Sequence, residues 1–110
     1  MTDKIVALST CSSAEEAEKI ARGLVERRLA ACVQITPGIR SFYRWKGEVQ
    51  TDNEFLLLIK THRGRWRRLE GELRQLHSYE VPELVALAVV DGSEDYLAWM
   101  DRELPPEREE

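Results

Sequence analysis

The feature that most constrains this chain is a pair of short segments that are apolar at every position. Residues 55–59 read Phe-Leu-Leu-Leu-Ile, and residues 84–90 read Leu-Val-Ala-Leu-Ala-Val-Val. Successive side chains of a β-strand point to opposite faces of the sheet, so a strand without polar alternation predicts burial on both faces. The chain is therefore expected to form a sheet that is covered on both sides.

Two amphipathic helices are predicted to cover one of those faces. Apolar residues recur at spacings of three and four through residues 13–29 and again through residues 66–76. Ser12 and Ser13 are each followed three positions later by a glutamate, Glu15 and Glu16, which is the pattern of a capping box at a helix N-terminus. The β-branched, apolar residues 4–10 precede this cap and predict the first strand.

A long hairpin is predicted between the two helices. Residues 30–35 and 39–45 form one extended segment that Pro37 interrupts, which predicts a bulge or kink. Lys46-Gly47 predicts a tight turn, after which residues 48–61 return antiparallel.

The order of these elements predicts the fold class. Strand, helix, strand, strand, helix, strand is the order of an α+β, ferredoxin-like βαββαβ antiparallel sandwich. Right-handed connections place both main helices on the same face of its sheet. Ser93 is expected to cap a short added C-terminal helix.

The second sheet face then requires a cover that one chain does not supply. Only the short third helix and the C-terminal residues remain, while both apolar segments place side chains on that face. A large apolar surface of this kind marks an interface. The pattern therefore predicts an oligomer in which sheets pack on sheets.

Size and charge narrow the class of protein further. With 110 residues, the chain is expected to form a single domain over residues 1–104 and a polar tail over residues 105–110. The net charge of −4 and the mixed signs disfavour partners such as nucleic acid or a membrane surface. No apolar run approaches the roughly 18 residues of a spanning helix, so no membrane segment is expected. Two unpaired cysteines and no secretory leader favour the cytoplasm.

Four side chains offer a thiol or an imidazole. Cys32 lies in an Ala-Ala-Cys-Val stretch and is interpreted as a small core residue. Cys11 lies beside the N-terminus of the first helix, which would lower its thiol pKa, and is the better metal candidate. His62 is interpreted as a solvated residue. His77 ends the second helix, where it either stabilises the helix C-terminus or contacts a metal or anion.

No catalytic motif accompanies these groups. The sequence contains no Gly-rich phosphate loop, metal-hydrolase motif or nucleophile elbow. We therefore expect a protein that is not an enzyme.

A possible ligand pocket is predicted from a second set of residues. Lys60 ends an otherwise apolar strand and requires a partner, for which Glu83 offers a carboxylate and Tyr79 a hydroxyl. Tyr43 and Trp45 add aromatic rings in the hairpin. Two interpretations stay open: an ion pair that supports an oligomer interface, or a polar pocket between subunits.

Four separate motifs resemble those of the CutA family of divalent-cation tolerance proteins. They are Leu-Ala-Ala-Cys-Val-Gln-Ile (29–35), Ser-Phe-Tyr-Arg-Trp-Lys-Gly-Glu-Val (41–49), Leu-His-Ser-Tyr-Glu-Val-Pro-Glu-Leu (76–84) and Tyr-Leu-Ala-Trp (96–99). The resemblance covers residues 4–104. It implies a cytoplasmic, ferredoxin-like homotrimer similar to the PII signalling proteins, associated with tolerance of copper and other divalent cations and with no established catalysis.

The resemblance carries over to a metal site only in part. The cysteine that some bacterial members use falls on Ser9, and of their adjacent histidine pair the positions here are Leu76 and His77. We therefore take His77, Cys11 and Glu83 as candidate metal ligands, with Cu²⁺ expected first, Zn²⁺ second and no organic cofactor. Two alternatives remain: a PII-like module that binds a small anionic metabolite through Lys60 and arginines at a subunit cleft, or a structural trimer that anchors a partner.

Overall fold

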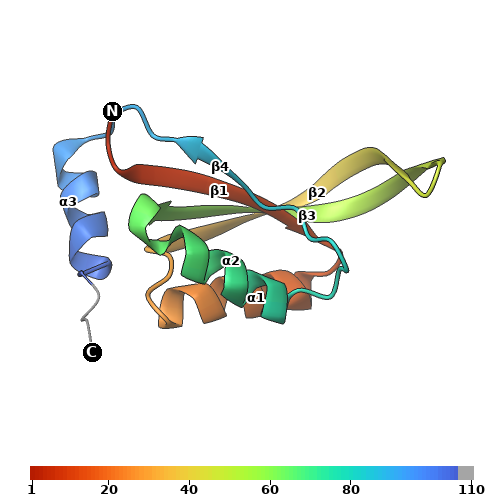
Figure 1. Cartoon of the computed structure of the whole chain (residues 1–110), viewed down its shortest axis with the longest axis horizontal. Coiled ribbons are helices and arrows are strands. Elements are labelled where there is room, and N and C mark those ends of the chain that lie inside the picture. Colours follow the sequence, from red (N-terminus) through yellow and green to blue (C-terminus); the bar gives the residue numbers. More distant parts are fainter. Residues whose placement is uncertain (107–110) are drawn as a thin grey trace.

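The computed structural model describes residues 1–106, so most of the predicted tail, residues 107–110, lies outside the described part of the chain. Four strands form one antiparallel sheet in the order β2-β3-β1-β4. Helices α1 and α2 cover one face of it, and α3 stands at the end opposite the projecting β2–β3 hairpin (Figure 1). This arrangement confirms the predicted α+β, ferredoxin-like fold with its added helix. The elements are β1 (Lys4–Cys11), α1 (Ala14–Glu26), β2 (Cys32–Trp45), β3 (Glu48–His62), the 3-10 turn η1 (Arg63–Arg65), α2 (Trp66–Leu76), β4 (Val85–Ala88) and α3 (Glu94–Glu103).

Of the two serines predicted as possible caps, Ser13 caps helix α1, and the helix ends earlier than expected. The Ser13 hydroxyl accepts a hydrogen bond from the Glu16 amide at 3.1 Å. The helix was predicted to reach residue 29, but Arg28 adopts a φ of 55° and turns the chain. The amides of Leu29 and Ala30 both donate to the Leu24 carbonyl, which closes the helix end.

The long hairpin has the predicted bulge and turn. Thr36 pairs with Leu56 and Ile39 with Glu54, so two residues, Pro37 and Gly38, lie opposite a single residue of β3. At the tip, Lys46 and Gly47 have φ values of 50° and 84°. Two positive values are those of a type I′ turn, whose twist matches that of the flanking strands.

The main core lies between the sheet and the two helices. It includes Leu57 and Ile59 of β3 together with the inner faces of α1 and α2. A smaller cluster forms where α3 meets the sheet, around Ala31, Met100 and Leu104. The buried Lys4 ammonium ties α3 to β1 through an ion pair with Asp101 at 2.8 Å.

The second face of the sheet is open in the single chain. The strand predicted over residues 84–90 forms only over Val85–Ala88, and all four of its residues are exposed. It is an edge strand with no helix on that face, so its expected burial on both sides does not occur within one chain. Leu56 and Leu58 of β3 are likewise only partly buried. Within residues 1–106, no helix has the length and apolar character needed to cross a membrane.

Candidate functional site

A cleft of about 860 Å³ lies between the hairpin and the loop that follows α2. The end of β1 supplies Thr10, the turn after it supplies Ser12, and the loop supplies residues 79–83. The β2 and β3 arms supply the remaining side chains just beyond the bulge, where the hairpin projects past the helices (Figure 1). The bulge therefore positions the hairpin arms against the loop.

The cleft is acidic and aromatic. Four carboxylates line it, and among the described residues no lysine or arginine does. The Tyr79 hydroxyl donates to the Glu54 carboxylate at 2.6 Å, and the Tyr43 hydroxyl donates to Asp52. Glu54 is only 5% exposed. The two phenols thus hold two carboxylates in place without neutralising them. The acidic residues are Asp52, Glu54, Glu80 and Glu83, and the rings are those of Phe42, Tyr43, Trp45 and Tyr79.

Burial, together with nearby negative charge, raises two pKa values in the cleft. Partial burial, and then the negative charge of Glu54, raise the pKa of Glu83. Burial, followed by the hydrogen bond to Glu54, raises the pKa of Tyr79 as well. Burial is the larger cause of both shifts, and only the smaller contribution from Glu54 is one that a cation in the cleft would offset.

Most of the residues predicted to form a ligand pocket meet in this cleft. Lys60 is the exception, because it pairs with Val6 and Cys32 further along β3. Its ammonium lies 5.4 Å from the centre of the Tyr96 ring of α3. The ion pair expected between Lys60 and Glu83 does not form. The Lys60 ammonium instead makes a cation–π contact with the Tyr96 ring. The four residues brought together are Tyr43, Trp45, Tyr79 and Glu83.

His77 lies beside the cleft, with both ring nitrogens engaged. Nε2 is 2.6 Å from the Thr10 carbonyl oxygen, to which it donates, and Nδ1 accepts from the Tyr79 amide at 3.1 Å. The ring is buried and contacts the Tyr79 ring. These bonds use the lone pair that a metal would need, so His77 acts here as the residue that anchors the loop to β1.

The two cysteines have the reverse of their expected environments. Cys11 is 0% exposed in the main core, whereas Cys32 is only partly buried. Burial, and then the charge of Glu16, raise the pKa of the Cys11 thiol to about 11. The nearby helix N-terminus does not lower it, because the side chain points into the core.

The three candidate metal ligands, His77, Cys11 and Glu83, do not form a shared site in the single chain. Within residues 1–106, no group of three or more His, Cys, Asp or Glu side chains is arranged to hold a metal ion. Sequence reasoning also missed Glu54 and Asp52. The sequence could have identified Glu54, because this charged residue directly precedes the apolar run 55–59, just as Lys60 directly follows it.

Comparisons with known proteins point to one family. The family described as CutA1 divalent ion tolerance protein matches residues 5–103. The divalent-cation tolerance protein CutA of Thermus thermophilus is 50% identical over 95 residues, covering 86% of this chain and 92% of that protein. The chloroplastic CutA of Arabidopsis thaliana is 44% identical over 96 residues, covering 87% of this chain and 53% of that protein. The chain thus spans nearly all of the bacterial relative and about half of the plant one.

Solved structures agree in fold. A divalent cation tolerance protein from Thermus thermophilus superposes with a TM-score of 0.87 at 49% identity, covering 88% of this chain and 94% of that one. CutA from Xylella fastidiosa has a TM-score of 0.91 at 42% identity, covering 94% and 99%. A protein from Archaeoglobus fulgidus, described as periplasmic, has a TM-score of 0.89 at 36% identity, covering 92% and 98%.

Proposed function

The chain belongs to the CutA1 divalent ion tolerance family, and on that basis we propose that it is a homotrimer that binds copper or another divalent cation in metal-ion homeostasis. Neither the family description nor the names of these relatives state a catalysed reaction, which supports a role other than that of an enzyme. Two free cysteines support a cytoplasmic location.

The observation that carries the proposal is the acidic cleft. Glu54 is buried in it beside Glu83, and no lysine or arginine among the described residues lines it. A bound cation would relieve the repulsion between these two carboxylates. The cleft is therefore the part of this chain best suited to a divalent ion.

The donor set determines how such an ion is held. Two neighbouring carboxylates occupy part of a coordination sphere, so the ion keeps water in its remaining positions. For a given set of ligands, Cu²⁺ binds more tightly than Zn²⁺ and the other first-row divalent ions. We therefore place Cu²⁺ first and Zn²⁺ second, as expected from the sequence.

The open sheet face supports the homotrimer. Val85 and Leu87 of β4 are among the exposed large hydrophobic residues, and β4 and β2 are the two edges of the sheet. Exposed apolar edges of this kind pair with other chains unless they are covered. Burial against two further copies would cover them.

Calorimetric titration of the metal-free protein with Cu²⁺ and Zn²⁺ tests the proposed site. The variants E54Q and E83Q should each weaken Cu²⁺ binding by about tenfold or more, because each removes one of the two charges. Glu18→Gln is the matched control, since it removes one exposed carboxylate from α1, outside the cleft.

Two results would contradict the proposal. If neither Cu²⁺ nor Zn²⁺ binds to the unmodified protein, the proposed cation-binding function is wrong. Cu²⁺ binding that survives in E54Q and E83Q but is lost in His77→Ala would move the site to the imidazole and away from the cleft.

A further inference from the structure

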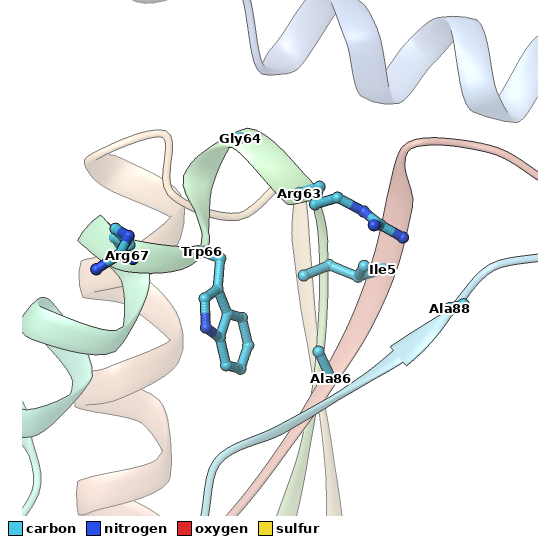
Figure 2. Close-up of a pocket in the computed structure, with 7 residues that line it drawn as sticks. All are labelled: Ile5, Arg63, Gly64, Trp66, Arg67, Ala86 and Ala88. Carbon is cyan, nitrogen blue, oxygen red and sulfur yellow. The ribbon is translucent and has the colours of Figure 1, made fainter.

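The chain has two cavities that differ in what surrounds them. The smaller, of about 470 Å³, lies against Ala86 and Ala88 of β4, with the Trp66 indole extending along one side (Figure 2). The proposed homotrimer covers this edge of the sheet with a further copy, so the smaller cavity is not a free site. The lining of the acidic cleft ends at Glu83, before β4 begins. The acidic cleft is therefore the cavity that is available to a small molecule.

The acidic cleft is much larger than a divalent ion requires. A metal ion with about six waters, at about 30 Å³ for each water, fills about 200 Å³. The cleft volume of about 860 Å³ lies instead within the range of small-molecule sites. Most of the cleft is thus left for a group other than an ion.

One face of the hairpin presents aromatic rings to that space. Strand register pairs Ser41 with Asp52. Because residues two positions apart on a strand share a face, Tyr43 and Trp45 lie on the same face as Asp52. Both rings line the cleft and are exposed, Tyr43 by 42% and Trp45 by 41%. The packing of their own chain therefore leaves these two rings free to contact an apolar or aromatic group.

Glu54 adds a negative charge that has no counter-charge. Its carboxylate is buried, and Oε2 accepts a hydrogen bond from the Tyr79 hydroxyl at 2.6 Å. In the part of the chain that the structure describes, Glu54 makes no ion pair, and its second oxygen accepts no hydrogen bond. A buried carboxylate is costly without a partner, so a cationic N–H donor suits this second oxygen.

A ring of the same hairpin already attracts a cation. The Arg40 guanidinium lies 5.6 Å from the centre of the Phe42 ring. Cations are attracted to the faces of tyrosine and tryptophan rings in the same way. The rings and the carboxylate thus favour one kind of ligand, a cation with an apolar body.

We propose that the acidic cleft binds a primary organic ammonium ion whose apolar body packs on Tyr43 and Trp45. The ammonium group donates to Glu54, and the two rings add a cation–π attraction. A primary ammonium fits better than a quaternary one, because only the primary group has N–H donors for the carboxylate oxygen. The inference rests on the cleft of the proposed function, but it requires no bound metal.

Calorimetric titration of the full-length protein with phenethylammonium, in the presence of a metal chelator, tests the proposal. At pH 7 such an amine is protonated, and saturable binding is expected. Phenethyl alcohol, which lacks the charge, and methylammonium, which lacks the ring, should each bind about tenfold more weakly or less. Phenethyltrimethylammonium, which has no N–H donor, should also bind more weakly than the primary amine.

Two variants separate the ring from the charge. Trp45→Leu and E54Q should each weaken amine binding by about tenfold or more. Only E54Q should also weaken Cu²⁺ binding, because the indole does not coordinate the ion. If Trp45→Leu does not fold, Tyr43→Leu replaces it.

Each variant has a matched control outside the cleft. Tyr96→Leu removes a ring of similar exposure, 39%, from α3, and Glu18→Gln removes an exposed carboxylate from α1. Both should leave amine binding unchanged.

The proposal is overturned by any of four results. The first three are no saturable amine binding up to about 10 mM, undiminished binding by both cleft variants, and equal binding of phenethyl alcohol. The fourth is binding by a dissociated Leu87→Asp variant but not by the parent protein, since assembly would then close the cleft. Amine binding without Cu²⁺ binding would confirm this proposal and contradict only the metal function.

Discussion

Glu83 shows how one carboxyl group can connect stability and ligand binding. Its pKa is raised by partial burial and by Glu54. A carboxyl whose pKa is raised on folding holds its proton more tightly in the native state than in the unfolded state. Its ionisation therefore lowers stability as the pH rises above the ordinary value of 4.5, and this loss persists at neutral pH.

Glu83→Gln should accordingly raise the melting temperature of the metal-free protein at pH 7, because the variant cannot ionise. The gain should vanish near pH 4, because Glu83 is then protonated in the native protein and is as uncharged as the glutamine that replaces it. Thermal unfolding followed by circular dichroism at the two pH values measures it. A variant that is less stable than the parent at pH 7 would show that Glu83 makes a favourable contact when ionised.

The cysteines provide a second prediction at the scale of single residues. With a pKa of about 11 and no exposure, Cys11 should not react with an aromatic disulfide reagent in the native protein at pH 8. The partly buried Cys32 should account for all native-state labelling, and Cys32→Ser should abolish it. Mass spectrometry of the labelled protein, with and without denaturant, identifies the thiol; native labelling of Cys11 would contradict this assignment.

At the scale of elements, the hairpin is defined by two local irregularities. The bulge at Pro37 and Gly38 sets the register of its outer arm, and the turn at Lys46 and Gly47 closes it. Side chains that face the acidic cleft come from that outer arm. The position of the cleft therefore depends on backbone geometry at a few residues.

Two glycine substitutions separate turn geometry from helix propensity. Gly47→Ala should lower the free energy of unfolding by about 1–2 kcal/mol, because φ is 84° there. Gly71→Ala should raise it by about 0.5–1 kcal/mol, because Gly71 lies within α2 and an added Cβ meets no atom within 4 Å. Denaturant unfolding at one protein concentration measures both. A stabilising G47A would mean that the turn is not of type I′ in solution.

For the whole molecule, the open sheet face predicts the state of assembly. Sedimentation equilibrium should give three times the chain mass of 12.7 kDa. Leu87→Asp, at a position 52% exposed on β4, should dissociate the assembly, because it places a charge on the face proposed to be covered. Val25→Asp is the control, at a position 41% exposed on α1, and should leave the mass unchanged. A monomeric parent protein would contradict the proposed homotrimer.

Charge is distributed unevenly over the molecule. The acidic cleft presents four carboxylates between aromatic rings, whereas Arg63 and Arg67 lie beside Trp66 near the other end of β1. The net charge of the whole chain, which is only −4, does not reveal this separation.

Local sequence was enough to predict the order of the elements, the capped start of α1, the bulge and the hairpin turn. Each of these depends on neighbouring residues: periodicity, the Ser13 hydroxyl, a proline that cannot donate, and a glycine with positive φ. The same reasoning selected Tyr43, Trp45, Tyr79 and Glu83, which the structure brings together in the acidic cleft.

The tertiary fold alone established which groups face one another. Strand register places Lys60 under the Tyr96 ring and away from Glu83, and core packing buries Cys11 while leaving Cys32 partly accessible. It also brings Arg63 and Arg67 to the same cavity as β4 residues about 20 positions away. Contacts across a sheet, and the desolvation that they cause, depend on how segments far apart in the sequence pack together. Local periodicity does not predict that packing.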